Sequence, residues 1–297
     1  MSDFVQQQNS VCDFATSDSW VILSPIEQSI KKKIEAVGTP LKDWDINIYR
    51  GVLTGCNEAF IIDSNKRDEI LANCQTEDER QRTVELIRPI LRGRDIKRYG
   101  YVDNGLYLIN THNGIRGRIP RIKIEDYPAV KAHLDQYWDR IATRADKGDT
   151  PYNLRNCAYL EDFSQPKIIW KRIGSILRFS FDKKGCLGLD STCFAAGEHI
   201  GYLCCVLNSL MGHYLLKDSP KTGTGDLLVS VQAIEPACIP YNAQYDSQLS
   251  SLLDMQISNP SDATEKEINN IVFTMYGLTP NEREYVTQYI KQSQQSL

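Results

Sequence analysis

The spacing of hydrophobic and polar positions changes along this chain, which predicts a mixture of helices and strands. Residues 24–27 (SPIE) form a capping box with proline at the first helical position, so a helix should begin there and end near Gly38. Residues 76–79 (TEDE) form a second capping box, and the helix that they open should end before Pro89. The N-terminal third of the chain is therefore expected to contain two capped helices.

Alternating apolar and polar residues predict the strands. Residues 45–55 (DINIYRGVLTG) and 59–63 (AFIID) fit two strands, with a turn between them at residues 54–57. Residues 105–110 (GLYLIN) predict a further strand. Residues 167–182 predict a strand pair closed at a Gly-Ser turn.

Helical spacing returns in three later segments. Residues 126–146 predict one long amphipathic helix with its aromatic side chains in the core. Residues 200–216 (IGYLCCVLNSLMGHYLL) are uncharged, but they contain polar residues and are barely long enough to span a bilayer, so we predict a buried helix. Residues from Asp246 onward are helical in pattern, with a break at residues 276–280.

Together these elements predict an α+β fold, with a mixed or antiparallel β-sheet, packed helices and a helical C-terminal segment. We place the divisions at 1–23 (N-terminal segment), 24–243 (main domain) and 244–297 (C-terminal segment). The composition, 41% apolar and 24% charged, is that of an ordinary soluble protein. Because the N-terminus lacks the basic start and apolar stretch of a secretory signal, we expect a cytoplasmic protein with no membrane partner.

The net charge of −4 hides an asymmetry along the sequence. Residues 80–123 contain eleven Lys or Arg and three acidic residues, which gives +8, whereas residues 226–297 contain nine acidic and three basic residues. A one-sided positive surface is what binding to a polyanion requires, although a solvated basic face is the commoner cause of a charge run.

Familiar catalytic motifs are missing from the sequence. There is no His-Glu-x-x-His, no Gly-x-Ser-x-Gly and no P-loop, and the four histidines lack ligand spacing. We therefore predict no catalytic and no metal-binding residue. A magnesium-dependent nuclease remains an alternative, with its groups among Asp95, Lys97, Asp162 and Lys167. For Asp95, which lies among arginines, a structural ion pair is the simpler interpretation.

Five segments carry a family resemblance when they are taken in order. They are KKKIEAVGTPLKDWDINIYRGVLTGCNEAFIID, ELIRPILRGRDIKRYGY, YPAVKAHLDQYWDRIATRADKGDTPYNLRNCAYLEDFSQPKIIW, GYLCCVLNSLMGHYLL and TMYGLTPNEREYV. These segments resemble the TaqI-like specificity domain, the C-terminal target recognition domain of type IIG restriction–modification enzymes and related adenine methyltransferases. The resemblance extends from about Trp20 to Ile290, nearly the whole chain.

The resemblance implies a sequence-specific reader of double-stranded DNA that positions its target for an adenine methyltransferase, and possibly a nuclease, domain. In the family the methyltransferase domain carries an Asn/Asp-Pro-Pro-Tyr/Phe motif, and this sequence has no Pro-Pro dipeptide. The expected partners are duplex DNA and a methyltransferase domain or subunit. No cofactor is expected in this segment, since S-adenosylmethionine and Mg²⁺ would belong to the catalytic domains. A protein-interaction module, whose acidic helical tail docks a methyltransferase subunit, is a second alternative.

The candidate DNA contacts lie in polar loops. Arginine can neutralise phosphates or pair with guanine, asparagine can pair with adenine, and glycine lets the backbone approach closely. The 54–57 turn is expected to face DNA, with an ordinary strand connection as the alternative, and the loops at 152–156 and 221–225 fit either role. The predicted DNA-binding residues are Thr54, Gly55, Asn57, Arg92, Arg94, Arg98, Asn113, Arg116, Arg118, Arg121, Arg155, Lys221 and Thr222.

Overall fold

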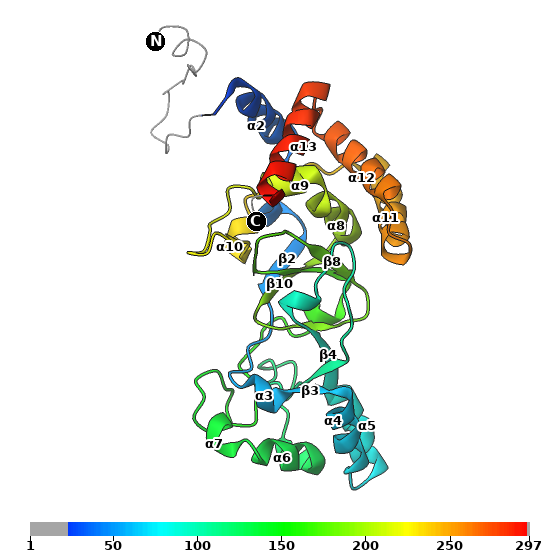
Figure 1. The fold of residues 1–297 in the computed structure, drawn as a ribbon. Helices are drawn as coiled ribbons and strands as arrows, with labels where there is room; N and C mark the ends of the chain where they lie inside the picture. The colour runs from blue at the N-terminus through cyan, green and yellow to red at the C-terminus, as the bar shows by residue number, and fades with distance from the viewer. Residues whose placement is uncertain (1–22, 296–297) are drawn as a thin grey trace.

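A central antiparallel sheet separates two packed units in this elongated molecule (Figure 1). The computed structural model describes residues 23–295, so the predicted N-terminal segment 1–23 lies outside them apart from Leu23. In the order β2-β10-β6-β8, the strands are β2 (Ile46–Arg50), β10 (Thr192–Gly197), β6 (Lys167–Lys171) and β8 (Phe179–Asp182). The strand pair predicted within 167–182 is confirmed, because β6 and β8 pair antiparallel. The α+β fold class is confirmed as well.

The central sheet is buried on both faces. In β10, Cys193 and Ala195 join the core on one side, whereas Phe194 and Ala196 join the core on the other. Successive side chains of a strand point to opposite faces, so a sheet covered on both sides favours a strand that is apolar along its length, such as TCFAAG. The shared sheet joins the two units.

The helical unit packs on one face of the central sheet (Figure 1). Its elements are α2 (Pro25–Val37), β1 (Thr39–Pro40), η1 (Leu41–Asp43), β7 (Ile173–Gly174), α8 (Ile200–Asn208), α9 (Leu210–Leu215), β11 (Leu227–Leu228), α10 (Val231–Ile234), β12 (Cys238–Ile239), α11 (Ala243–Ser258), α12 (Asp262–Met275) and α13 (Pro280–Gln295). The capping box of α2 is confirmed by reciprocal hydrogen bonds between Ser24 and Glu27.

The C-terminal helices share the core of the helical unit. Leu249, Ile268 and Val286, from α11, α12 and α13, are fully buried in the same cluster as Ile30 of α2. Their apolar faces are therefore used within this chain, which weakens the alternative that the acidic tail is a free docking element. The division placed after residue 243 stays a prediction.

The apolar segment 200–216 forms two short helices instead of the single helix that we predicted. The Ser209 hydroxyl accepts a hydrogen bond from the Gly212 N–H at 3.1 Å and donates to the Val206 carbonyl at 2.6 Å, so α8 ends and α9 begins there. Within residues 23–295, no helix combines the length and the apolar character that crossing a bilayer requires.

The small-sheet unit covers the other face of the central sheet. Its elements are α3 (Asn57–Phe60), β3 (Ile61–Asp63), α4 (Ser64–Ala72), α5 (Glu77–Leu86), β4 (Ile87–Leu91), η2 (Gly93–Asp95), β5 (Leu106–Ile109), η3 (Ile124–Asp126), α6 (Pro128–Asp135), α7 (Trp138–Ile141), η4 (Asp162–Ser164) and β9 (Leu187–Gly188). The strands lie in the order β3-β5-β4-β9. The predicted strand at 105–110 is confirmed. The second predicted helix is confirmed as well, and the Thr76 hydroxyl caps it by accepting from the Glu79 N–H. The Glu79 carboxylate accepts from the Gln75 N–H instead of the Thr76 N–H, so the predicted capping box is present only in part.

Two predictions for this unit are wrong in part. Residues 59–63 begin in helix α3 and only then form β3, which joins a different sheet from β2. The helix predicted over 126–146 is divided into α6 and α7, and Trp138, expected in the core, is 44% exposed. In both places tertiary packing overrides the local apolar pattern.

The carboxylate of Glu282 on α13 accepts hydrogen bonds from Ser29 and Lys33 of α2. This contact should make the free energy of unfolding depend on pH in the acidic range. Burial alone would raise its pKa, but hydrogen bonds from Lys33, Ser29 and Thr279 outweigh burial and hold the pKa of Glu282 at about 2. A depressed carboxyl pKa stabilises the fold above the unfolded-state value, and this stability is lost as the pH falls. We expect the free energy of unfolding contributed by Glu282 to decline between about pH 5 and pH 2.

Urea unfolding of Glu282→Gln should show a loss of about 1–2 kcal/mol at pH 7 and a weaker acid dependence than the parent chain. Glu284→Gln, at an exposed position two residues further along α13, is the matched control and should leave both quantities nearly unchanged. Equal effects of the two substitutions would contradict this role for Glu282.

Candidate nucleic-acid interface

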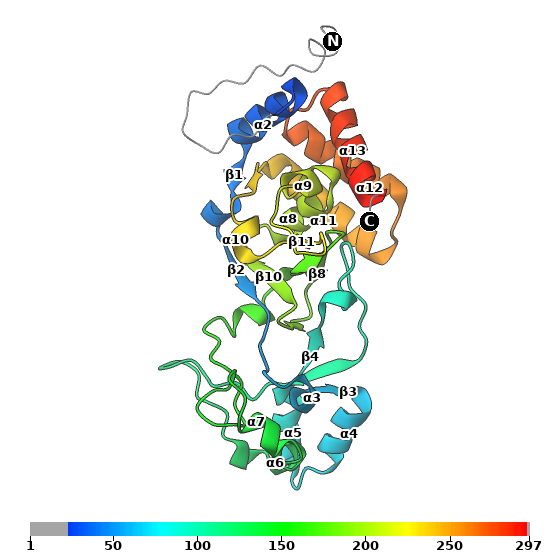
Figure 2. The same cartoon turned by 60° about the vertical axis from the view of Figure 1, so that its left-hand side comes forward.

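A short hairpin rich in arginine extends from the small-sheet unit (Figure 2). We call residues 113–121 the basic hairpin. Ile115 and Ile119 form an antiparallel bridge, and the turn uses Gly114 and Gly117 at φ of 74° and 78°. These left-handed conformations favour glycine, which explains the spacing NGIRGR in the sequence. Arg116 and Arg118 flank Gly117 and are exposed to solvent.

A cleft of about 720 Å³ lies beside the basic hairpin. One wall is the hairpin itself, with Arg116, Arg118 and Arg121, and the other contains Asp149 and residues 156–158. We call this space the hairpin cleft. It brings together polar groups from two segments that are separated in the sequence by η3, α6 and α7.

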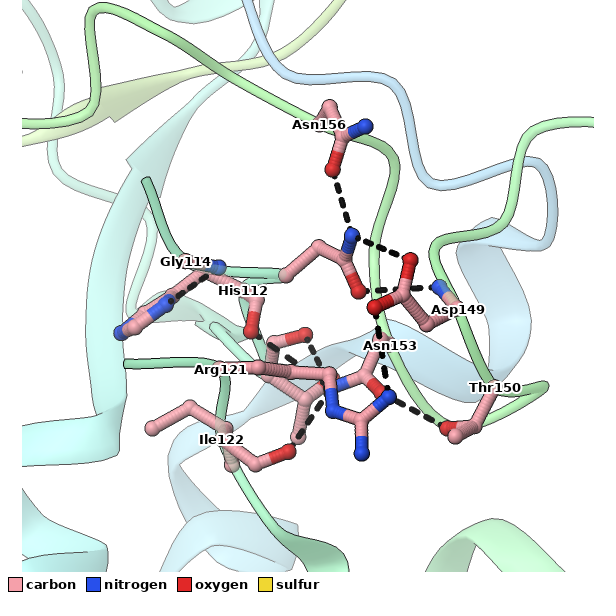
Figure 3. A network of polar contacts seen from close by, with 10 residues as sticks. His112, Gly114, Arg121, Ile122, Asp149, Thr150, Asn153 and Asn156 are labelled. Atoms are coloured by element: carbon pink, nitrogen blue, oxygen red, sulfur yellow. Dashed lines mark hydrogen bonds and ion pairs between the residues drawn. The ribbon is translucent and has the colours of Figure 1, made fainter. Parts of the chain in front are cut away.

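The amide of Asn113 connects the two walls of the hairpin cleft through Asp149 and Asn156, which are labelled in Figure 3. Its nitrogen donates to Asp149 Oδ1 at 3.0 Å and also to Asn156 Oδ1, while its oxygen accepts from the Asp149 N–H at 2.9 Å. Both sides of the amide are thus engaged, so Asn113 shapes the hairpin cleft instead of presenting free groups to DNA. Asn156, which belongs to the 152–156 loop considered from the sequence, is exposed and donates no hydrogen bond to the described residues.

Buried side chains hold the second wall in place. The guanidinium of Arg144, 7% exposed, donates to carbonyl oxygens of Pro151 and Asn153 at 2.5 and 2.6 Å. Asn153, 1% exposed, donates to the carbonyl of Ile122 at 2.9 Å at the base of the hairpin (Figure 3). Burial lowers the pKa of His112, which favours the neutral ring whose Nδ1 accepts from the hairpin backbone. The hairpin cleft therefore rests on a hydrogen-bonded scaffold that the sequence did not reveal.

The exposed arginines differ in their partners. Arg118 pairs with Glu161, Arg121 Nη1 lies 3.3 Å from Asp149 Oδ2, and Arg155 Nη1 lies 3.2 Å from Asp146 Oδ1. Arg116 and Arg94 are exposed, and their side chains have no polar partner among residues 23–295. Among the three hairpin arginines, Arg116 could therefore bind a ligand without breaking an ion pair with a carboxylate of residues 23–295.

We predicted that the 54–57 turn faces DNA. The Thr54 hydroxyl of this turn is instead turned into the protein. Thr54 is 2% exposed, and its hydroxyl accepts from the Cys56 N–H at 3.2 Å and donates to Asn57 Oδ1 at 2.5 Å. Gly55 has φ of 66°, and a side chain there would press against Arg144. The turn begins α3 and packs against the loop that supports the hairpin cleft, so its threonine and glycine serve the scaffold.

Two of the predicted DNA-binding arginines are engaged inside the protein. Arg92 Nε and Nη2 both lie 3.0 Å from Asp95, as the structural ion pair that we predicted for Asp95 requires. Arg98 lies 2.5 Å from Glu265 of α12 and also donates to the Asn208 carbonyl, so it links a loop of the small-sheet unit to the helical unit. Arg92 and Arg98 therefore make structural contacts in the folded chain, and a role of either residue in DNA binding stays a prediction.

Lys221 and Thr222 belong to the helical unit and not to the hairpin cleft. Lys221 is exposed beside a separate small pocket that His213 and Tyr289 also line. Thr222 forms a hydrogen bond of 2.8 Å with Thr224 in the same loop. The structure does not bring these two residues together with the arginines of the basic hairpin.

The residues of the nuclease alternative do not form a common site. Asp95, 2% exposed, bonds to Arg92 and Asn104, whereas Lys167, fully buried, lies 2.5 Å from Asp182. Within residues 23–295, no group of three or more His, Cys, Asp or Glu side chains is arranged to hold a metal ion. The geometry therefore gives this alternative no support.

Comparisons with known proteins relate the fold to restriction–modification enzymes. No protein-family model matches the chain, and no curated protein matches it. The fold is similar to that of MmeI, a type IIL restriction–modification enzyme solved in complex with DNA, with a TM-score of 0.61, 10% identity, and coverage of 88% of this chain and 37% of that one. BpuSI, a type IIG restriction endonuclease, matches with a TM-score of 0.47, 14% identity, and coverage of 85% and 33%.

The chain thus spans about a third of the length of these solved structures. At 10% identity, the likeness to MmeI establishes a shared fold. Assignment to the TaqI-like specificity domain stays a prediction from the sequence.

Proposed function

We propose that this chain is a sequence-specific recognition module for double-stranded DNA in a restriction–modification system. It would position its target for an adenine methyltransferase domain or subunit outside this chain, where S-adenosylmethionine and Mg²⁺ would also bind. The observation that carries the proposal is the basic hairpin, which places Arg116, Arg118 and Arg121 around one open cleft on a rigid scaffold. The fold that the chain shares with MmeI, a protein solved with DNA, supports it.

The dimensions of a hairpin suit the major groove of DNA. That groove admits a two-stranded β-ribbon, and arginine there can donate two hydrogen bonds to guanine O6 and N7. Arg116, at the tip and without a carboxylate partner, is the best placed residue for such a base contact. Arg118 and Arg121, which already pair with carboxylates, are suited to phosphates, which provide affinity without sequence information. The free amide nitrogen of Asn156 adds one more donor in the same cleft.

The proposal is tested by titrating the purified chain into a fluorescent pool of duplexes with a randomised core, at two salt concentrations, and sequencing the bound fraction. We expect one short motif to be enriched and the affinity to fall as salt rises, because phosphate contacts release counterions. A lack of binding at low salt would refute DNA recognition by this chain, and salt-sensitive binding without enrichment would refute sequence specificity.

The conformation of the hairpin should matter independently of its charge. A Cβ at Gly114 would lie 2.4 Å from the Ile119 carbonyl oxygen, whereas a Cβ at Gly117 would meet no atom within 4 Å. Both glycines have positive φ, so alanine at either position costs roughly 1–2 kcal/mol of local strain, and only Gly114→Ala adds a clash. We expect Gly114→Ala to weaken binding to the enriched duplex about tenfold or more, and Gly117→Ala to have a smaller effect. Equal affinities of the two variants would show that hairpin shape is unimportant.

A further inference from the structure

Two carboxylates pair with arginines of the basic hairpin. Asp149 lines the hairpin cleft and pairs with Arg121, while Glu161 lines a neighbouring pocket, which shares Ile119 with the cleft, and pairs with Arg118. Two of the three hairpin arginines are therefore already held by an anion. A surface that only had to attract DNA would not need acidic groups at these positions, because they repel the phosphates.

The two ion pairs are exposed enough to exchange. The side chains of Arg121 and Asp149 are 38% and 62% exposed, and those of Arg118 and Glu161 are 64% and 50% exposed. Exposed pairs of this kind contribute little free energy, since water screens them. A phosphate offers an arginine the same kind of anionic oxygen as a carboxylate does. The exchange of either carboxylate for a DNA phosphate as the partner of the arginine should therefore change the free energy only slightly.

The two oxygens of Asp149 have different partners, so the charge of this residue can be removed without losing its structural hydrogen bond. Its Oδ1 accepts from Asn113, whereas Oδ2 faces Arg121. An amide at position 149 keeps an oxygen that can accept from Asn113 and removes only the charge. Asp149→Asn and Glu161→Gln therefore weaken the two ion pairs while preserving the size of both side chains.

We propose that Asp149 and Glu161 compete with DNA for Arg121 and Arg118, and so limit the affinity of the hairpin cleft for any duplex. This inference rests on the proposed function. Each arginine leaves its carboxylate when a phosphate takes the same place, so the free energy of the ion pair is subtracted from that of DNA binding. Non-target sites in a genome far outnumber targets, and a lower affinity shortens the time that the protein spends on each of them.

The test is an affinity measurement on Asp149→Asn/Glu161→Gln with the enriched duplex and with a duplex of unrelated sequence. We expect binding to both duplexes to tighten, by about two- to fivefold for each ion pair removed. The matched control is Glu35→Gln/Asp254→Asn, which removes two exposed carboxylates, paired with Lys31 and Lys183, from the helical unit. It changes the net charge equally and should leave the affinity nearly unchanged.

A mutant cycle then tests whether the gain acts through the arginines. Combining Asp149→Asn/Glu161→Gln with Arg118→Ala/Arg121→Ala should abolish the gain, because no arginine remains to be released. Unchanged or weaker binding by Asp149→Asn/Glu161→Gln, in a chain that still binds DNA, would overturn this inference and leave the proposed function intact. Failure of the parent chain to bind any duplex at low salt would instead overturn the proposed function, and this inference with it.

Discussion

Replacing Lys167 with methionine should lower the free energy of unfolding by about 3–5 kcal/mol, because it leaves a buried carboxylate without its counter-charge. Lys167 and Asp182 are both fully buried, and Lys167 Nζ lies 2.5 Å from Asp182 Oδ2. The lysine also donates to the Phe163 carbonyl at 2.7 Å, and the aspartate accepts from the Tyr101 hydroxyl at 2.9 Å. This pair ties the central sheet to segments of the small-sheet unit.

Urea unfolding of Lys167→Met gives the measurement. Lys183→Met is the matched control, because Lys183 is exposed and its partner Asp254 is exposed as well, and it should change stability by less than about 0.5 kcal/mol. Lys167→Met/Asp182→Asn should recover part of the loss, since a neutral amide no longer needs a buried cation. A loss below about 1 kcal/mol for Lys167→Met would contradict the assigned role of the pair.

Removing the three hairpin arginines should have the largest effect on DNA binding. Arg116→Ala/Arg118→Ala/Arg121→Ala deletes every cation of the basic hairpin while leaving the supporting bonds of Asn113 and Asn153 in place. We expect about a 100-fold loss of affinity at low salt. The plot of log affinity against log salt should become shallower by about 2, since each of the two lost phosphate contacts removes about 0.9.

An equal change of charge elsewhere separates a local site from general attraction. Lys31→Ala/Lys183→Ala/Lys266→Ala removes three exposed lysines that lie outside the hairpin cleft. Two of them belong to the helical unit, in α2 and α12, and Lys183 follows β8 of the central sheet. We expect this variant to keep most of the affinity of the parent chain. Equal losses in the two triple variants would mean that DNA responds to net charge and not to the hairpin cleft.

Much of the fold could be predicted because its signals are local. The capping box at 24–27 and the Thr76 cap fix helix starts through bonds within one turn, and the strand pair at 167–182 has its turn between its strands. The second strand of the 45–63 segment could not be predicted correctly, because the short helix α3 precedes it and the Thr54 hydroxyl bonds to Cys56 and Asn57 where that helix begins. A threonine at this position would look the same in the sequence if the segment were only a connection between two strands.

The arginine run from 80 to 123 shows why the site was harder to predict than the fold. Charge counting treats all of its members alike, whereas the structure gives some arginines different partners and leaves Arg94 and Arg116 without a polar partner among residues 23–295. Arg92 meets Asp95 three residues away, which the sequence did suggest, but Arg98 meets Glu265, which lies far along the chain. Asn156 and Arg144 carry no motif, and their roles depend on contacts that only the folded loops create.

Hydrogen exchange of the chain with and without the enriched duplex tests the central claim most directly, because it locates the DNA on the backbone. We expect DNA to slow exchange in residues 111–123 and 148–158, the two walls of the hairpin cleft, and to leave α11, α12 and the loop at 217–226 unchanged. Slower exchange confined to the helical unit, with no change in the basic hairpin, would contradict the account.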